Sequence, residues 1–100
     1  METFDRTAAL PAQMQGRWTD LDDPNSELII ASGEVIYQGA AVDYEFKEIG
    51  EVEGALTVNF RVADPHQEDS FQRENIIGLA LTSDGELHAW SVKFAATFTR

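Results

Sequence analysis

Apolar and polar residues alternate with a period of two along much of the chain, which is the pattern of β-strands with one buried face. The alternation is clearest over residues 42–47, where Val42, Tyr44 and Phe46 are separated by charged residues. We expect these three to face inward and the charged residues between them, Lys47 included, to face solvent. Residues 56–62 repeat the period after an acidic turn at residues 50–54, so the two segments predict a β-hairpin.

Turn signals divide the rest of the chain into further short strands. Ser32-Gly33 separates predicted strands over residues 27–31 and 34–38, and a turn at residues 83–85 follows a longer predicted strand over residues 71–82. Residues 63–70 are predicted to form a polar loop. The pattern contains no helix of the length that a crossover connection needs, so neighbouring strands should be antiparallel.

The expected number of strands favours a closed sheet. An up-and-down meander leaves two unpaired edges unless it closes on itself, and about eight strands can close a small barrel. We therefore predict an all-β fold, a small antiparallel up-and-down β-barrel of about eight short strands, with the strands carrying Trp18 and Phe98 as neighbours. Residues 1–15 should form an N-terminal lid with a short helix within residues 2–13. The length of 100 residues fits one domain, residues 1–100.

Composition narrows the possible partners. With 18 acidic and 7 basic residues, the formal net charge of −11 opposes binding to nucleic acid or to an anionic membrane surface. The chain has no cysteine, which removes disulfides, thiolate metal ligands and cysteine nucleophiles. Its first residues lack the basic and apolar regions of a signal peptide, and no apolar run reaches the length of a membrane helix. We expect a cytoplasmic protein.

Gly16-Arg17-Trp18 is a candidate anchor for one end of the barrel, because an indole brings a large apolar surface and one N–H that needs a partner. Together with Arg100, the basic residue after the last predicted strand, this stretch resembles the lipocalin/calycin pattern. The resemblance spans roughly residues 10–100 as a pattern of strands. It implies that Trp18 packs across the closed end of the barrel against Arg100, and that the barrel encloses an apolar cavity.

Aromatic residues supply the candidate pocket. Six of them are placed to project into one interior: Tyr37, Tyr44, Phe46, Phe60, Phe94 and Phe98. Apolar walls with a few polar tips, here the two tyrosine hydroxyls, are typical of small-molecule sites. The alternative is a filled core, because an eight-stranded barrel is only just wide enough for its own side chains.

A second apolar set falls out of phase with the inward positions. The inward and outward alternation of the strands puts its members on the outer face: Ile29, Ile36, Ile76, Ala80, Trp90 and Val92. A contiguous exposed patch usually marks an interface, so a homodimer is expected, with all of these except Ala80 as interface candidates. The alternative is a β-bulge that shifts the phase and buries some of them.

Catalytic and metal-binding signals are weak. His66 lies among acidic residues, but the only other histidine, His88, is distant in sequence, and a solvated acidic loop is the simpler interpretation. As a general base, His88 lacks an identifiable partner. The chain contains no nucleophile elbow, phosphate-binding glycine loop or dinucleotide fingerprint. We therefore predict no catalytic residue, no metal and no cofactor.

The predicted function is that of a small lipocalin-like β-barrel protein that binds a small apolar ligand. The alternative is a homodimeric structural or interaction module with a filled barrel and no ligand. An enzyme that uses His88 or a tyrosine ranks behind both, since the fold by itself says little about function.

Overall fold

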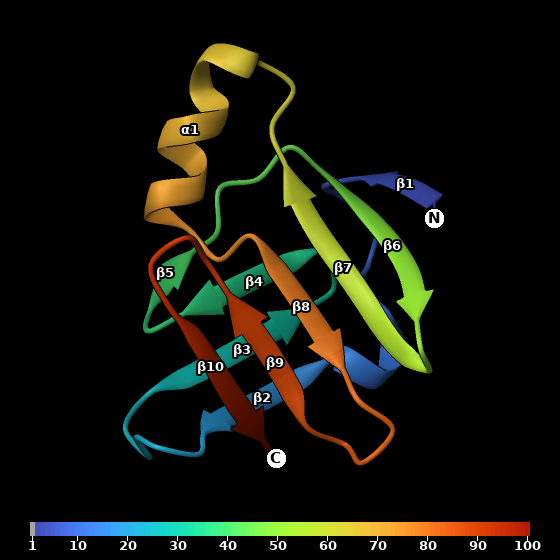
Figure 1. Cartoon of the computed structure of the whole chain (residues 1–100), viewed down its shortest axis with the longest axis vertical. Coiled ribbons are helices and arrows are strands. Elements are labelled where there is room, and N and C mark those ends of the chain that lie inside the picture. Colours follow the sequence, from blue (N-terminus) through green and yellow to red (C-terminus); the bar gives the residue numbers. More distant parts are fainter. Residues whose placement is uncertain (1) are drawn as a thin grey trace.

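The computed structural model describes residues 2–100, and within them it has ten strands, one α-helix and one turn of 3-10 helix (Figure 1). The helical segments are η1 (Ala12–Met14) and α1 (Pro65–Glu74). The strands are β1 (Glu2–Asp5), β2 (Gly16–Asp20), β3 (Glu27–Ala31), β4 (Glu34–Tyr37), β5 (Ala40–Ala41), β6 (Phe46–Val52), β7 (Ala55–Arg61), β8 (Gly78–Leu81), β9 (Leu87–Trp90) and β10 (Ala95–Thr99).

All ten strands belong to one curled antiparallel sheet with the order β1-β6-β7-β8-β9-β10-β2-β3-β4-β5. The predicted neighbours are paired, because Phe98 of β10 lies opposite Asp20 of β2. The order begins at β1 and ends at β5, so no pair among the described strands closes the barrel. The prediction of an antiparallel all-β sheet is therefore confirmed, but the structure is a half-barrel of ten strands rather than a closed barrel of eight.

The core lies inside the curl of the sheet, and most of its members alternate along the strands as expected. The fully buried side chains include Trp18, Leu28, Ile30, Val35, Val58, Leu79, Leu87 and Phe98. The predicted hairpin is also present, as β6 and β7 pair from Phe46–Arg61 to Val52–Ala55. Its turn residues Glu53 and Gly54 both have positive φ, which is the backbone of the tight turns that suit the strand twist.

The alternation over residues 42–47 breaks where β6 begins. Val42 and Tyr44 are buried as expected, but Phe46 lies opposite Arg61 on the outer face and Lys47 lies opposite Phe60 on the inner face. The irregular segment before β6 shifts the phase by one residue. Lys47 is fully buried, contrary to the expectation of solvent exposure, because backbone carbonyls in the interior accept its ammonium hydrogens.

Residues 63–82 also differ from the prediction. The polar loop and long strand are replaced by α1 and by the short strand β8. Asp64 caps the helix by accepting a hydrogen bond from the His66 N–H at 2.9 Å, and Pro65 starts the first turn with the φ a helix needs. Apolar periodicity could not indicate this helix, because Phe71 is its only buried residue.

The N-terminal segment is a strand followed by η1, whereas the sequence predicted a short helix within residues 2–13. β1 pairs along the free edge of β6, and Phe4 lies opposite Lys47. Pairing with an available sheet edge satisfies the backbone N–H and C=O groups of this segment, which is why tertiary context outweighs its weak helical pattern.

A seam of non-strand contacts joins the two open sides of the half-barrel, and it consists of Arg6, Leu10, Ser32, Gly33 and Tyr44. The Leu10 N–H donates to the Ser32 carbonyl at 2.9 Å, and the Tyr44 hydroxyl donates to the Gly33 carbonyl. Arg6 donates to the Tyr44 carbonyl at 3.0 Å. A Cβ at Gly33 would overlap the Arg6 carbonyl oxygen, so the close approach of the two segments requires glycine.

Candidate functional site

One end of the half-barrel is sealed around Trp18. Its side chain is 1% exposed, and its indole N–H donates to the Met14 carbonyl of η1 at 2.9 Å. The Arg100 guanidinium lies 4.2 Å from the indole ring centroid and donates to the carbonyls of Gln13 and Gln15. We call this group the sealed end. The indole N–H and the guanidinium both have partners, so this end offers stability rather than a binding surface.

Gly16 is required at the sealed end for two reasons. Its φ is +118°, a backbone conformation that other residues rarely adopt. A Cβ at this position would also lie 2.9 Å from the Arg100 guanidinium. The structure thus brings together all three predicted anchor residues, Gly16, Trp18 and Arg100, although Arg100 is far from the other two in the sequence.

The six predicted pocket aromatics do not share one interior. Tyr44 and Phe60 pack with ring centroids 4.8 Å apart in the core, and Phe46 is on the outer face. Tyr37 stacks on Phe94 at 5.6 Å and meets Phe98 edge-on at 6.1 Å. Phe98 is fully buried whereas Phe94 is 37% exposed, so this second cluster reaches from the core to the surface.

Lys47 and Tyr44 form a buried polar pair in the core. The ammonium donates to the Asp5 carbonyl at 2.7 Å and to the Tyr44 hydroxyl at 3.1 Å. Burial lowers the pKa of Lys47 below its usual 10.5, because desolvation disfavours the charged amine. Burial also raises the pKa of the Tyr44 hydroxyl to about 12. The pair is enclosed and its hydrogen bonds are made, so its role is to hold the seam.

The other end of the half-barrel is covered by α1, which connects β7 to β8 and lies on the far side of the molecule from the C-terminus (Figure 1). The helix inserts Phe71 toward the core, and this side chain is 6% exposed. The remaining residues of α1 are mostly polar or charged, so the helix covers this end without filling it. We call it the open end. Two clefts lie beside it.

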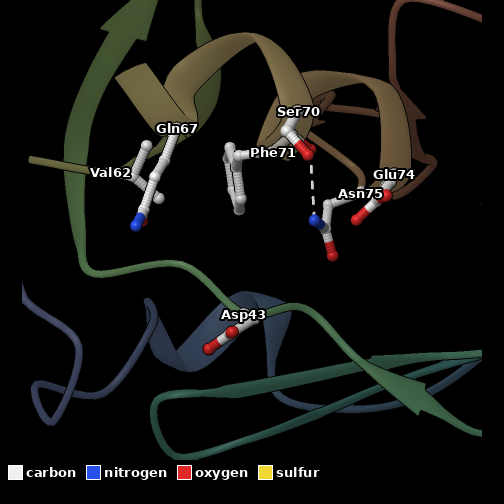
Figure 2. Close-up of a pocket in the computed structure, with 7 residues that line it drawn as sticks. All are labelled: Asp43, Val62, Gln67, Ser70, Phe71, Glu74 and Asn75. Carbon is white, nitrogen blue, oxygen red and sulfur yellow. Dashed lines mark hydrogen bonds between the residues drawn. The ribbon is translucent and has the colours of Figure 1, made fainter. Parts of the chain in front are cut away.

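The first cleft has an open volume of about 350 Å³, and most of its lining residues are polar, with Val62 and Phe71 as the apolar ones. Figure 2 shows Gln67, Phe71 and Glu74 projecting from the helix on one side and Asp43 alone on the opposite side. The Asn75 carboxamide donates to the Phe71 carbonyl at 3.1 Å and ends the helix. Asp43 is paired with Arg6 at 3.1 Å, which leaves this wall little free charge.

The second cleft, which we call the aromatic cleft, also has a volume of about 350 Å³. Its apolar wall is formed by Tyr37, Ile76 and Phe94, and its rim by residues of α1 and of the β9–β10 turn. The complete set of lining residues is Tyr37, Arg73, Glu74, Asn75, Ile76, Ser91, Lys93 and Phe94. A volume at the small end of the range for small-molecule sites, with aromatic walls and a few polar groups, suits a small ligand.

The β9–β10 turn presents two of these side chains through a local hydrogen-bonding motif. The Ser91 hydroxyl oxygen accepts hydrogen bonds from the backbone N–H groups of Lys93 and Phe94, at 3.1 and 3.3 Å. The Ser91 N–H in turn donates to the Phe94 carbonyl at 2.8 Å. Such serine-centred turns form from local sequence, and this one places Lys93 and Phe94 on the cleft wall.

Sequence reasoning found two residues of the aromatic cleft, Tyr37 and Phe94, as pocket candidates. It placed Ile76 on the outer face and did not consider Arg73, Asn75 or Lys93. The helix that carries Arg73 was missing from the prediction. The sequence signal for this helix was Asp64 followed by Pro65, with Gln67 three residues after the capping Asp64. This is the spacing of a capped helix N-terminus.

The candidate interface residues are dispersed in the structure. Ile29 and Ile36 lie opposite each other on the outer face of β3 and β4, and Val92 is 56% exposed in the β9–β10 turn. Trp90 lies across Gly78 on the outer face, where a Cβ at Gly78 would overlap the indole. The expectation that Ile76 lies on the outer face was wrong, because this residue precedes β8 and is buried in the core, with 2% of its surface exposed. The five do not form one patch.

The two histidines lie apart in separate environments. The His88 Nδ1 is 3.2 Å from the Thr97 hydroxyl on the outer face, and His66 lies in the first turn of α1. Within residues 2–100, no three His, Asp or Glu side chains gather closely enough to hold a metal ion. No helix in this range has the length and apolar character needed to cross a lipid bilayer.

No family model, curated protein or solved structure matches this chain. The half-barrel and the Trp18–Arg100 contact are compatible with a barrel fold, and function must be argued from the geometry of the clefts.

Proposed function

We propose that the protein binds a small apolar molecule in the aromatic cleft and that its barrel is lipocalin-like. The observation that carries the proposal is the stacked pair of Tyr37 and Phe94, which forms the wall of an open cleft and leaves Phe94 37% exposed. An aromatic side chain held in place at a concave surface is a typical contact for a planar or aliphatic ligand.

The position of the cleft determines where on the half-barrel the ligand would bind. The interior is filled by Tyr44, Phe60, Phe98 and their aliphatic neighbours, all buried. The ligand would therefore bind at the mouth of the half-barrel, between α1 and the β9–β10 turn, rather than in a deep cup. The Trp18–Arg100 contact at the sealed end supports the lipocalin-like assignment, because that resemblance implies it.

The test is a titration with naphthalene as the apolar probe, followed by amide chemical shifts. We expect saturable shifts at residues 91–94 and at the end of α1. In Phe94→Ala the affinity should fall about tenfold, because an aromatic contact worth roughly 1.5 kcal/mol is lost. Val52→Ala, an exposed apolar truncation at the β6–β7 turn, is the control and should change nothing. No saturable binding, or equal binding by Phe94→Ala, would refute the proposal.

A second candidate function, a homodimeric module, is favoured by the outer face of β3 and β4. Ile29 and Ile36 are partly exposed neighbours there, and Ile36 also pairs with Ala41 of the edge strand β5. Sedimentation should then show a dimer that Ile36→Lys dissociates, whereas a monomer at high micromolar concentration would remove this candidate. The cytoplasmic location stays a prediction.

A further inference from the structure

The basic residues of this acidic chain are, with one exception, engaged in pairs within residues 2–100. The chain has 7 Lys and Arg residues against 18 Asp and Glu. Six have an ion pair or hydrogen bonds from the side chain: Arg6, Arg17, Lys47, Arg61, Arg73 and Arg100. Lys93 alone makes no side-chain ion pair or hydrogen bond among the residues that the structure describes.

This unpaired cation lies on the aromatic cleft. The Ser91-centred turn fixes the backbone of Lys93 and Phe94, and both residues line this cleft. A flexible lysine beside an apolar wall can place its charge at the rim while its methylene groups cover apolar surface. An ammonium in a chain of net charge −11 would otherwise find a carboxylate partner easily.

The opposite rim adds a second cation whose present partner is easily displaced. Arg73, in the last turn of α1, pairs with Asp69 at 3.1 Å, and both side chains are more than half exposed. Exposed pairs of this kind contribute little free energy, so an incoming anion can compete for the guanidinium. Glu74 is the one carboxylate that lines the aromatic cleft, and it also lines the first cleft, where its oxygens lie beside Asn75 (Figure 2).

We infer that the ligand of the aromatic cleft is a small amphipathic carboxylate, with its apolar body against Tyr37 and Phe94 and its carboxylate at Lys93. The inference rests on the proposed function and names the chemical class of its ligand. The free cation selects against neutral molecules of the same shape, because a hydrogen bond between charged groups is about twice as strong as a neutral one. It selects more strongly against cations, which the acidic surface would otherwise attract.

Three probes that each carry one naphthalene group separate the apolar from the ionic contribution to binding affinity: naphthalene-acetate, naphthyl-ethanol and naphthyl-ethylammonium. We expect the carboxylate to bind about tenfold more tightly than the alcohol, and the ammonium to bind most weakly. The advantage of the carboxylate should shrink as salt is raised from 50 to 500 mM, because the rim charges are exposed, while binding of the alcohol should hardly change.

The deciding variant is Lys93→Gln, with Arg17→Gln as its control. Both remove one positive charge from the chain, but Arg17 is on β2 and does not line the cleft. Lys93→Gln should reduce the affinity for naphthalene-acetate about tenfold and leave that for naphthyl-ethanol within twofold. Arg17→Gln should leave both within twofold. Equal losses in the two variants would mean that only the net charge matters, and would overturn the inference.

The outcomes distinguish this inference from the proposed function. If none of the three probes saturates, the proposed function itself fails. If all three bind at residues 91–94 with similar affinity, the proposed function holds and the selection for a carboxylate is refuted. Concentration-dependent shifts of the same residues without probe would show that a second copy of the chain occupies the cleft, and would also refute the inference.

Discussion

The sealed end and the open end of the half-barrel are built from the same sheet but solve the problem of closure differently. At the sealed end, Trp18 is covered by η1 and by Arg100, and its indole N–H is bonded to Met14. At the open end, a polar helix inserts one side chain, Phe71, and leaves two clefts beside the helix. The difference teaches that a filled, fully bonded end supplies stability, while an end covered by a mostly polar element retains concave surface for binding.

The largest expected effect tests the stabilising role of the sealed end. Trp18→Ala should lower the free energy of unfolding by about 3–5 kcal/mol, because a large buried side chain is replaced by a cavity. Phe71→Ala at the open end should cost about 2 kcal/mol, since water from the adjacent clefts can enter the space it leaves. Urea unfolding of both variants measures the difference. Equal losses would show that the two ends contribute alike.

The seam that joins the two open sides of the half-barrel supplies the next test. Gly33→Ala should destabilise the protein by about 2 kcal/mol, because a Cβ there would overlap the Arg6 carbonyl oxygen and the two segments would have to move apart. Its effect should also appear as faster amide exchange at Leu10, whose N–H bonds to Ser32. Urea unfolding and hydrogen exchange check this. Unchanged stability would mean that the seam is loose.

A pH titration probes the buried pair at the seam. The pKa of Tyr44 is raised to about 12 in the folded protein against 10.0 in the unfolded chain, so the folded state holds the proton more tightly. The contribution of this proton to the free energy of unfolding is complete below pH 10. It is lost as the pH rises toward 12, and the free energy of unfolding falls by an amount on the order of 2 kcal/mol. Lys47 has the opposite effect, because its pKa is lowered in the folded protein and the unfolded chain holds the proton more tightly. The free energy of unfolding therefore rises as the pH approaches 10.5 from below.

Two variants separate these opposing effects of pH on the free energy of unfolding. Tyr44→Phe should abolish the fall above pH 10, and Lys47→Met should abolish the rise below pH 10.5. Urea unfolding at a series of pH values measures both slopes. A Tyr44→Phe variant that loses stability above pH 10 as steeply as the natural chain would show that other groups cause the fall.

The smallest expected effect compares two exposed arginines, one at each end. Arg100→Gln should cost about 1–2 kcal/mol, because the guanidinium contacts the Trp18 ring and bonds two carbonyls that end η1. Arg73→Gln should cost at most about 0.5 kcal/mol, since it loses one exposed pair on a helix. Thermal unfolding resolves the two. A loss in Arg73→Gln as large as in Arg100→Gln would contradict the comparison between the ends.

The elements that the sequence predicted well are those whose signals are local. The β6–β7 hairpin followed from period-two alternation around a turn with Gly54, and the turn at Ser32-Gly33 joins β3 and β4 as expected. The neighbouring positions of β2 and β10 were predicted from closure of an eight-stranded barrel, and the two strands do pair although the sheet stays open. Each of these depends on side chains close in sequence or on a general rule about strands.

The candidate site was only partly predictable. Tyr37 and Phe94 were identified as pocket residues, but they were grouped with Tyr44 and Phe60, from which the structure separates them. One shift of phase at the start of β6 turned Phe46 outward and Lys47 inward, and alternation cannot reveal such a shift. The rim residues Arg73 and Asn75 depended on a helix with one buried apolar residue, which periodicity does not detect.

By itself, the sequence determined an antiparallel all-β sheet with one buried face, because alternation and turn chemistry act over a few residues. Tertiary structure alone decided that the edges remain unpaired, that Lys47 is buried against the Asp5 carbonyl of β1, and that Lys93 has no side-chain partner within residues 2–100. The physical reason is that burial and pairing depend on groups brought together from distant segments, and the free energy of each contact is set where they meet.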